Sequence, residues 1–279
     1  MIVGIIGGGF VGKALKLLEC DDLNMLIYDI NKDLCNPKNI EMKDLLKCEC
    51  IFLCLPTPMN PNGSCNIDII CNVVTKLRDL NYKGCIICKS TVPVDTCDNL
   101  NINFCPEFLT EKNYEEDFIN TSEWIIGLLN NTDIKLKELF SKMINIAYKN
   151  RRIKSDKIIY LRNKEAEMVK LFKNSYLATK VSFCNEMYEY CKKKDINYDI
   201  VRDNVVLDKR IEKSHTLVPG HDNKFGFGGT CLVKDIHNLE YEMELNNCNC
   251  LVLKNVIKRN ETVDRQEKDW MLNKGRAVV

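Results

Sequence analysis

Short apolar runs and longer amphipathic stretches alternate along the first half of the chain. Apolar runs of about four to eight residues predict buried strands, whereas apolar residues spaced three or four apart predict helices. Strands and helices that alternate in this way are typical of βαβ units around a parallel sheet, which helices cover on both faces. We expect strands at Ile2–Ile6, Met25–Tyr28, Cys50–Leu55, Cys85–Cys88 and Trp124–Leu128, and helices at Val11–Leu18, at Asp68–Leu80 with Asp68 as its N-cap, and at Asp133–Ala147.

The second half of the chain has a helical pattern instead. From Glu165 to about Lys194 neither proline nor glycine interrupts it, which predicts a helix of roughly eight turns, or ~45 Å. Such a helix needs a partner along its whole length, and a second copy of the chain is one solution. Beyond it we expect a short helix at 199–206, a glycine-rich polar loop at 208–229, a helix from about Asp235 and a final helical stretch at 250–273.

A glycine motif follows the first predicted strand. Gly7-Gly8-Gly9-Phe10-Val11-Gly12 has the spacing G-x-G-x-x-G and opens the first predicted helix. In dinucleotide-binding folds the first glycine permits a tight turn, the second lets a pyrophosphate approach the backbone, and the third lets helix and strand pack closely. We therefore expect an α/β protein with an N-terminal Rossmann-type domain at residues 1–160, followed by an all-helical domain, built on the long central helix, at 161–279.

Asp29 indicates which dinucleotide is bound. It stands 17 residues beyond Gly12, at the end of the second predicted strand, where an acid binds the ribose hydroxyls. A carboxylate there repels a 2′-phosphate, so we expect NAD rather than NADP, although Lys32 softens that preference. The less favoured alternative is that the glycines serve only a tight turn.

The amino-acid composition limits the kinds of binding partner that we expect. The 279 residues include 40 lysines and arginines against 39 acidic residues, and a net charge of +1 gives no basic stripe of the kind that binds nucleic acid. No apolar run approaches the ~20 residues needed to cross a membrane, and the first predicted strand leaves no room for a secretory signal. We therefore expect a cytoplasmic protein that binds neither nucleic acid nor membranes.

The sixteen cysteines are expected to be free thiols, because a reducing compartment disfavours disulfides. With only three histidines, and no two cysteine pairs in a finger-like arrangement, we predict no metal site. Most of the cysteines are expected to be small core residues.

One cysteine has an unusual setting. In Phe225-Gly-Phe-Gly-Gly-Thr-Cys231-Leu-Val-Lys234-Asp235, glycines precede a cysteine near a helix start, where a thiol can be acidified. Lys234 adds positive charge, and Asp235 lies on the same helical face as Cys231 if the helix has begun there. The alternative is one more buried core cysteine, which the glycines, Lys234 and Asp235 disfavour.

This run resembles the active-site segment of the UDP-glucose/GDP-mannose 6-dehydrogenase family. Further segments resemble that family in the same order, and the resemblance spans essentially the whole chain. It implies a four-electron oxidation of a nucleotide sugar's C6 alcohol to a carboxylate, with two NAD⁺ used in succession, UDP-glucose as the favoured substrate, and a homodimer joined through the central helix. The further segments are Leu55-Pro-Thr57-Pro, Lys89-Ser-Thr91-Val-Pro93, Cys105-Pro-Glu107-Phe-Leu-Thr-Glu111 and the helix around Lys170-Leu-Phe-Lys-Asn174.

The resemblance also implies a role for individual residues. The expected catalytic residues are Thr91, Glu107, Lys170, Asn174, Cys231 and Asp235. The expected NAD-binding residues are Gly7, Gly9, Phe10, Val11, Gly12, Asp29, Lys32, Thr57, Thr91, Glu111 and Lys234. The expected substrate-binding residues are Glu107, Phe108, Leu109, Lys170, Asn174, Arg210, Phe225, Gly228 and Cys231.

Lys170 and Asn174 also make chemical sense without the resemblance. They are four apart on the predicted helix, so they project from one face and can stabilise an oxyanion. An exposed helix face is the alternative. Arg210 matches a family arginine that reaches the substrate across the dimer interface, and a plain surface arginine is the alternative there.

A reaction order follows from these roles. Hydride leaves C6 for the nicotinamide, the Cys231 thiolate attacks the aldehyde, and a second hydride transfer gives a thioester. Glu107 and Glu111 follow a proline at a spacing that can put both carboxylates on one side of a turn, and one of them activates the hydrolytic water. Thr91 orients a water that relays the substrate's proton toward Asp235.

Two other functions remain open. A two-electron β-hydroxyacid-type dehydrogenase also carries a lysine and an asparagine four apart on a helix, but it has no use for Cys231. The second open function is that of a truncated, non-catalytic paralogue that binds NAD or a nucleotide sugar. Family members continue into a second Rossmann-like domain that helps to hold the nucleotide, whereas this sequence stops at Val279, so we expect a short form without that domain.

Overall fold

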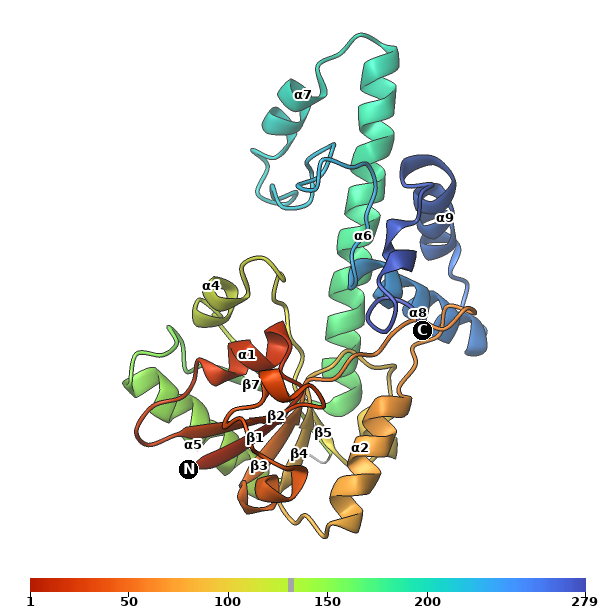
Figure 1. Ribbon diagram of the computed structural model, residues 1–279. Helices are drawn as coiled ribbons and strands as arrows, with labels where there is room; N and C mark the ends of the chain where they lie inside the picture. Colours follow the sequence, from red (N-terminus) through yellow and green to blue (C-terminus); the bar gives the residue numbers. More distant parts are fainter. Residues whose placement is uncertain (130–132) are drawn as a thin grey trace. The chain divides into compact units, whose positions relative to one another are not determined.

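A computed structural model describes residues 1–129 and 133–279. The chain divides into two compact units, each with its own core. Unit 1 consists of Met1–Thr57 and Ile67–Lys170, and unit 2 of Pro58–Asn66 and Leu171–Val279. The sheet lies in unit 1 and most of unit 2 is helical (Figure 1), which confirms the predicted α/β class with a Rossmann-type sheet followed by helices.

Unit 1 is built on a seven-stranded sheet with the order β2-β1-β3-β4-β5-β6-β7. All neighbouring strands are parallel except β5 and β6, which are antiparallel. We expected a wholly parallel sheet, so the antiparallel pairing of β5 with β6 differs from the prediction. The strands are β1 (Ile2–Ile6), β2 (Asn24–Tyr28), β3 (Cys50–Leu53), β4 (Cys85–Cys88), β5 (Asn103–Phe104), β6 (Trp124–Leu128) and β7 (Ile158–Arg162).

The strand pleat sorts the apolar side chains into two cores. Successive residues of β3 point to opposite faces, so Phe52 joins one core and Leu53 the other. Helices α1 and α5 cover the first face, and α2 covers the second (Figure 1). The helices of this unit are α1 (Phe10–Lys16), α2 (Asp68–Asp79), α3 (Thr96–Asn99), α4 (Tyr114–Ile119) and α5 (Ile134–Lys149), with short 3-10 helices η1 (Lys32–Leu34) and η2 (Met42–Lys47).

The long helix α6 (Asn163–Lys193) has 31 residues and begins two residues before the predicted start. Its first residues belong to unit 1 and the remainder to unit 2. Unit 2 continues with α7 (Tyr198–Val205), α8 (Leu232–Leu245), α9 (Leu251–Arg259), the π-helical turn η3 (Asn260–Asp264) and the 3-10 turn η4 (Asp269–Leu272).

The core of unit 2 lies where α6, α8 and the C-terminal turns meet. Ala178 of α6 packs with Ile236 of α8, and Trp270 of η4 joins them in the same buried cluster. Met59 lies in that cluster too, because its N–H donates to the Ala277 carbonyl at 2.9 Å. The segment that follows β3 is thereby paired with the end of the chain.

Several predicted boundaries are wrong, and three of them concern how a helix begins or ends. Helix α8 begins at Leu232 rather than near Asp235, because Cys231 already occupies the N-cap position. The stretch predicted as one helix from 250 to 273 is α9, η3 and η4, since the π turn at Asn260–Asp264 ends the regular helix. Asp68 is the first residue of α2, and the N-cap is Ile67.

All sixteen cysteines are free, eight of them are buried, and Cys248 is the one exposed cysteine. Among the described residues, no helix is both long enough and apolar enough to cross a membrane.

Candidate active site

The glycine loop joins β1 to α1 in unit 1. A side chain at Gly7, whose φ is +106°, would place its Cβ 2.1 Å from the Cys54 carbonyl oxygen. At Gly12 a Cβ would lie 2.0 Å from the Gly7 carbonyl oxygen. At Gly9, the N-cap of α1, a Cβ would meet nothing within 4 Å. The first and third glycines are therefore required by packing, whereas the middle one borders open space at the helix start, as a bound pyrophosphate requires.

Asp29 is anchored to that loop. It follows the last residue of β2, and its Oδ2 accepts a hydrogen bond from the Gly8 N–H at 2.6 Å. Its Oδ1 accepts from the Asn31 N–H at 2.8 Å. Lys32 lies over the Tyr28 ring, with Nζ 5.3 Å from the ring centroid. The predicted ribose-binding acid thus stands beside the loop predicted to hold the pyrophosphate.

Two threonines connect the segments that follow β3 and β4. The Thr57 hydroxyl donates to the Thr91 carbonyl at 2.8 Å, and both residues are buried. The neighbouring Ser90 hydroxyl bridges the same two segments, because it donates to the Leu55 carbonyl at 2.6 Å. The carboxyl ends of these strands, where doubly wound folds bind ligands, are therefore firmly tied together.

Glu107 and Lys170 form a buried ion pair in unit 1. Lys170 Nζ lies 2.8 Å from Glu107 Oε1 and donates to the Glu107 carbonyl at 2.7 Å. The Leu109 N–H donates to Oε2 at 2.8 Å. Burial acts to raise the pKa of Glu107, but Lys170, the Leu109 N–H and Lys89 together lower it. The Glu107 carboxylate is therefore ionised although its residue is only 7% exposed.

The remaining residues of this segment have different surroundings. Phe108 packs beneath Lys170, whose Nζ lies 5.6 Å from the ring centroid. Glu111 is exposed whereas Glu107 is buried. The two carboxylates were expected on one side of a turn, and the structure instead gives them different environments.

Lys89 is a buried residue of this unit to which the sequence motif assigns no role. It directly follows β4 and is only 3% exposed. Its Nζ donates to the Pro106 carbonyl at 3.0 Å and lies 3.5 Å from Cys105 Sγ. Lysine is almost never fully buried unless it is paired. A lysine directly after an apolar central strand is therefore the sequence signal for a buried, partnered cation.

In unit 2, Cys231 stands at the N-terminus of α8. It is half-buried, and its carbonyl accepts the Asp235 N–H at 3.0 Å, which closes the first helical turn. Asp235 therefore does lie one turn beyond Cys231. The start of a 14-residue helix is the end whose dipole favours an anion such as a thiolate.

Asp235 is the centre of a buried polar cluster. Asn174 Nδ2 of α6 donates to Asp235 Oδ2 at 2.5 Å, and Lys234 Nζ donates to Oδ1 at 2.6 Å. Burial opposes the charge of Lys234, but Asp235, Cys65 and Cys231 raise its pKa overall. Asn174 is 7% exposed and Lys170, one helical turn before it, is 3% exposed. Each member of the predicted oxyanion pair is thus buried against a carboxylate, which sequence spacing did not reveal.

The other predicted substrate residues lie in the loop before α8. The Arg210 side chain is 88% exposed and pairs with Asp208. Phe225 is 42% exposed and packs against the Tyr188 ring at a centroid distance of 5.5 Å. A Cβ on Gly228 would lie 2.4 Å from Arg265 Cζ, so the loop lies directly against that arginine.

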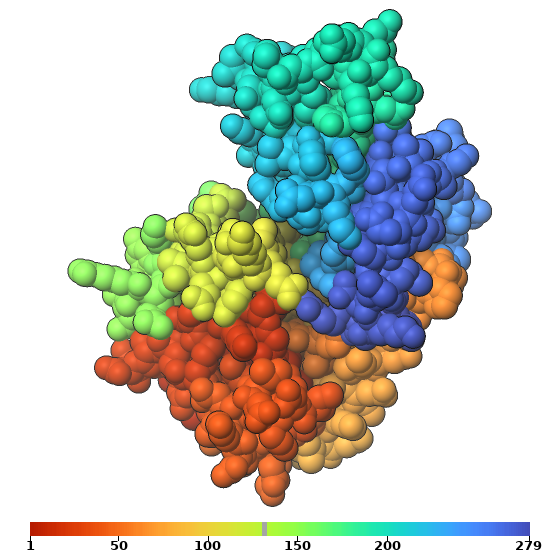
Figure 2. All heavy atoms as spheres, turned by 45° about the horizontal axis from the view of Figure 1, so that its top comes forward, coloured from red at the N-terminus to blue at the C-terminus, as the bar shows by residue number. Residues whose placement is uncertain are grey.

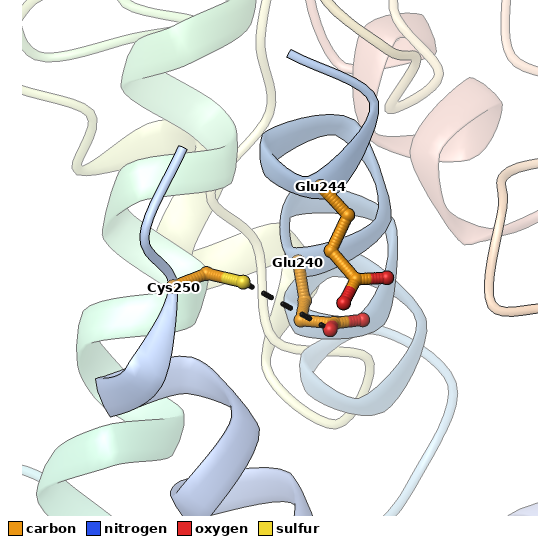
Figure 3. Close-up of side chains that lie close together, drawn as sticks. All are labelled: Glu240, Glu244 and Cys250. Carbon is orange, nitrogen blue, oxygen red and sulfur yellow. Dashed lines mark hydrogen bonds between the residues drawn. The ribbon is translucent and has the colours of Figure 1, made fainter. Parts of the chain in front are cut away.

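One group of side chains in the described ranges is close enough to share a cation. The ligand atoms of Glu240, Glu244 and Cys250 lie within 4.8 Å of one another (Figure 3). Each already has a protein partner: Cys250 Sγ lies 4.0 Å from Glu240 Oε1, and Lys254 forms an ion pair with Glu244. Burial and the neighbouring Glu244 raise the pKa of Glu240. These interactions account for the cluster, and we assign no metal to it.

The chain matches two models of one family. The NAD binding domain of the UDP-glucose/GDP-mannose dehydrogenase family matches residues 34–144, and the central domain of that family matches residues 164–262. A UDP-glucose 6-dehydrogenase of Rickettsia felis is 31% identical over 236 residues, which are 80% of this chain and 50% of that protein. The chain thus spans about half the length of that relative.

Two solved structures share the fold. A UDP-glucose dehydrogenase from the archaeon Pyrobaculum islandicum superposes with a TM-score of 0.76 and 22% identity, over 93% of this chain and 68% of that one. A 3-hydroxyisobutyrate dehydrogenase of Mycobacterium tuberculosis superposes with a TM-score of 0.71 and 12% identity, over 92% of this chain and 91% of that one. The two family models and the Rickettsia relative match this chain in sequence, which is stronger evidence than a shared fold. The chain therefore belongs to the UDP-glucose/GDP-mannose dehydrogenase family.

Proposed function

We propose that the protein is an NAD-dependent nucleotide-sugar 6-dehydrogenase that oxidises the C6 alcohol of UDP-glucose, or a related nucleotide sugar, to the carboxylate. The observation that carries this proposal is Cys231 at the start of α8, one turn before the buried Asp235. A thiol in that setting is a nucleophile that a four-electron oxidation uses and a two-electron oxidation does not.

NAD fits the residues that unit 1 presents. The space beside Gly9 accommodates a pyrophosphate at the start of α1, and Asp29 supplies an acceptor for ribose hydroxyls. Phe10, Val11, Lys32, Thr57, Thr91 and Glu111 of unit 1, with Lys234 of unit 2, are the remaining residues assigned to the cofactor. When bound, NAD supplies the hydride acceptor that each of the two oxidations requires.

Asp235 and Thr91 handle the proton of the alcohol in this proposal. As hydride leaves C6, the hydroxyl proton passes through a water held by Thr91 to Asp235, and the alcohol becomes an aldehyde. Lys234 and Asn174 hold the two Asp235 oxygens at 2.6 and 2.5 Å, which keeps the acceptor fixed.

Cys231 then keeps the aldehyde from escaping. The thiolate forms a C–S bond with the aldehyde carbon, and the oxyanion is stabilised by Lys170 and Asn174. Loss of the second hydride from that carbon gives a thioester. Glu107 takes a proton from the hydrolytic water, the C–S bond breaks, and the carboxylate and the Cys231 thiol are released.

Counting the reduced cofactor tests this proposal. Purified protein is incubated with NAD⁺ and UDP-glucose, and both the NADH formed and the sugar consumed are measured. Two NADH for each UDP-glucose support the four-electron reaction. One NADH indicates a two-electron dehydrogenase, and none indicates a binding protein. A parallel panel of UDP- and GDP-sugars identifies the preferred substrate.

A two-electron β-hydroxyacid-type dehydrogenase is the second candidate. Lys170 and Asn174 lie one turn apart on α6 and are both buried, which is the arrangement that such an enzyme would also use. The thiol at position 231 has no part in that chemistry, so this candidate leaves the glycine-rich loop before α8 unexplained.

We also propose that the protein forms a homodimer through α6. Phe172, Tyr176, Phe183 and Tyr190 are each more than half exposed. At 3.6 residues per turn these four positions fall within about 40° of one line along the helix, which makes a continuous aromatic stripe. The same stripe on a second copy is a self-complementary partner.

A further inference from the structure

The glycine-rich loop before Cys231 is held by the side chain of Asn260. Asn260 Oδ1 accepts the Phe227 N–H at 2.8 Å, and Asn260 Nδ2 donates to the Phe227 carbonyl at 2.9 Å. One carboxamide thus satisfies both backbone groups of a single loop residue. Asn185 of α6 adds a second anchor, because its Oδ1 accepts the Gly226 N–H at 3.1 Å. Asn260 is 1% exposed and Asn185 is 4% exposed, so these bonds are shielded from water.

Asn260 reaches the loop because the regular helix ends there. It opens the π turn η3, which the Arg265 N–H closes by donating to the Asn260 carbonyl at 2.8 Å. A π turn is an uncommon helical element. Here it turns the Asn260 side chain toward the loop. Figure 2 shows the light-blue loop region beside the darker blue C-terminal turns.

The loop lies against this turn without room for side chains. Gly226 has a φ of +65°, and a Cβ there would lie 2.3 Å from Asn260 Oδ1. Gly228 lies against the Arg265 guanidinium. That guanidinium is fixed in turn, because it donates to both Asp269 oxygens at 2.8 and 2.7 Å and pairs with Asp222 at 2.7 Å.

We propose that Asn260 is a positioning residue for the Cys231 thiol, a role that rests on the proposed function only where turnover is concerned. Phe227 is four residues before Cys231, and the intervening Gly228 and Gly229 have little conformational preference of their own. The bond pair at Phe227 therefore fixes the backbone four residues before the thiol. Asn260 sets the direction from which the chain enters α8, and with it the direction in which Cys231 faces.

Replacing Asn260 tests this role. Asn260→Ala removes both bonds to Phe227, and Asn260→Asp keeps the shape and the acceptor but loses the donor. Asn255→Ala is the matched control, because Asn255 lies on α9, is exposed, and donates to the Leu251 carbonyl of its own helix. Circular dichroism establishes that each variant is folded. If Asn260→Ala does not fold, the isosteric Asn260→Asp carries the test.

Four measurements distinguish a positioning role of Asn260 from a general effect on the fold. We expect kcat to fall about 10- to 100-fold in the Asn260 variants, as for a displacement of about 1 Å of a reacting group. We expect KM for NAD⁺ to change far less than kcat, because all residues assigned to the cofactor except Lys234 belong to unit 1. We expect iodoacetamide to alkylate Cys231 faster relative to Cys248 in the same molecule, and amide hydrogen exchange at Phe227 to accelerate.

The outcomes are distinguishable from a failure of the proposed function. If the unmodified protein forms no NADH, the proposed function fails, but the alkylation ratio and the hydrogen exchange still test Asn260. A folded Asn260 variant with an unchanged or lower Cys231-to-Cys248 alkylation ratio overturns the positioning role. So does a variant whose kcat equals that of Asn255→Ala.

Discussion

Lys170 and Asn174 show what the spacing of residues predicts and what it does not. Their separation of four placed them on one helical face, and the structure buries both on α6. Their partners were not predicted, because Glu107 lies 63 residues from Lys170 and Asp235 lies 61 residues from Asn174. The spacing of residues predicts which face of a helix is buried. Which residue of another element contacts that face depends on the tertiary fold. Asn260 was missed for the same reason.

The Glu107–Lys170 pair predicts a large cost for removing one partner. Lys170→Met leaves the ionised Glu107 buried without its counter-ion, so we expect the free energy of unfolding to fall by about 3–5 kcal/mol. Lys164→Met on the same helix is the control. Lys164 pairs with Asp95 on the surface, where solvent screening leaves such a pair with little effect on stability. Urea unfolding of both variants measures the difference, and similar losses would contradict the buried pair.

The strands and helices were predicted best where apolar runs are long and uninterrupted. β1 and β4 have the predicted bounds, because four or five consecutive apolar residues have no other place in a covered sheet. β5 has only two residues, which are too few to show an apolar run or an alternating pattern, so it was not predicted. β7 was missed because its residues span the predicted domain boundary between positions 160 and 161. Helix ends were less accurate, because caps and π turns depend on contacts from elsewhere in the chain.

The π turn η3 contains a carboxylate whose titration is measurable. Burial raises the pKa of Asp264 to about 6, even though Arg259 opposes the rise, and Glu189 and Glu186 add to it. Among the described residues, Asp264 Oδ2 is buried without a hydrogen-bond partner. Because the folded state binds this proton more tightly than the unfolded state, stability falls as the pH rises from about 4 to about 6 and stays lowered above that.

Asp264→Asn removes that titration. We expect the variant to gain stability relative to the unmodified protein as the pH rises, reaching roughly 1 kcal/mol at pH 8, since the group is partly screened by solvent. Thermal or urea unfolding at pH 5 and pH 8 measures this gain. Asp203→Asn is the control, because Arg202 lowers the pKa of the exposed Asp203. A gain in stability over the unmodified protein that is no larger at pH 8 than at pH 5 would refute the assignment.

The chain as a whole carries the two matched family domains within two compact units. Unit 1 holds the glycine loop, Asp29 and the Glu107–Lys170 pair, and unit 2 holds Cys231 and the Asp235 cluster. Residues proposed for one reaction are therefore contributed by both units. The sequence identified them through motifs, and the structure shows how each unit fixes its own set.

The aromatic stripe on α6 predicts a dimer. Sedimentation of the unmodified protein should give twice the mass of the chain, whereas Phe183→Asp places a charge at the centre of the stripe and should give a monomer. Ile134→Asp is the control, because Ile134 is also exposed but lies on α5 in unit 1. A monomeric unmodified protein, or a dimeric Phe183→Asp variant, would rule out this interface.

The most direct test of the account is to trap the covalent intermediate on Cys231. Glu107→Gln removes the proposed base that hydrolyses the thioester, so incubation with NAD⁺ and UDP-glucose should leave a UDP-uronyl group on the protein. Intact-mass and peptide mass spectrometry should find that group on Cys231, and Cys231→Ser should neither acquire it nor form the carboxylate. A Cys231→Ser variant that produces the carboxylate at the unmodified rate would contradict the account.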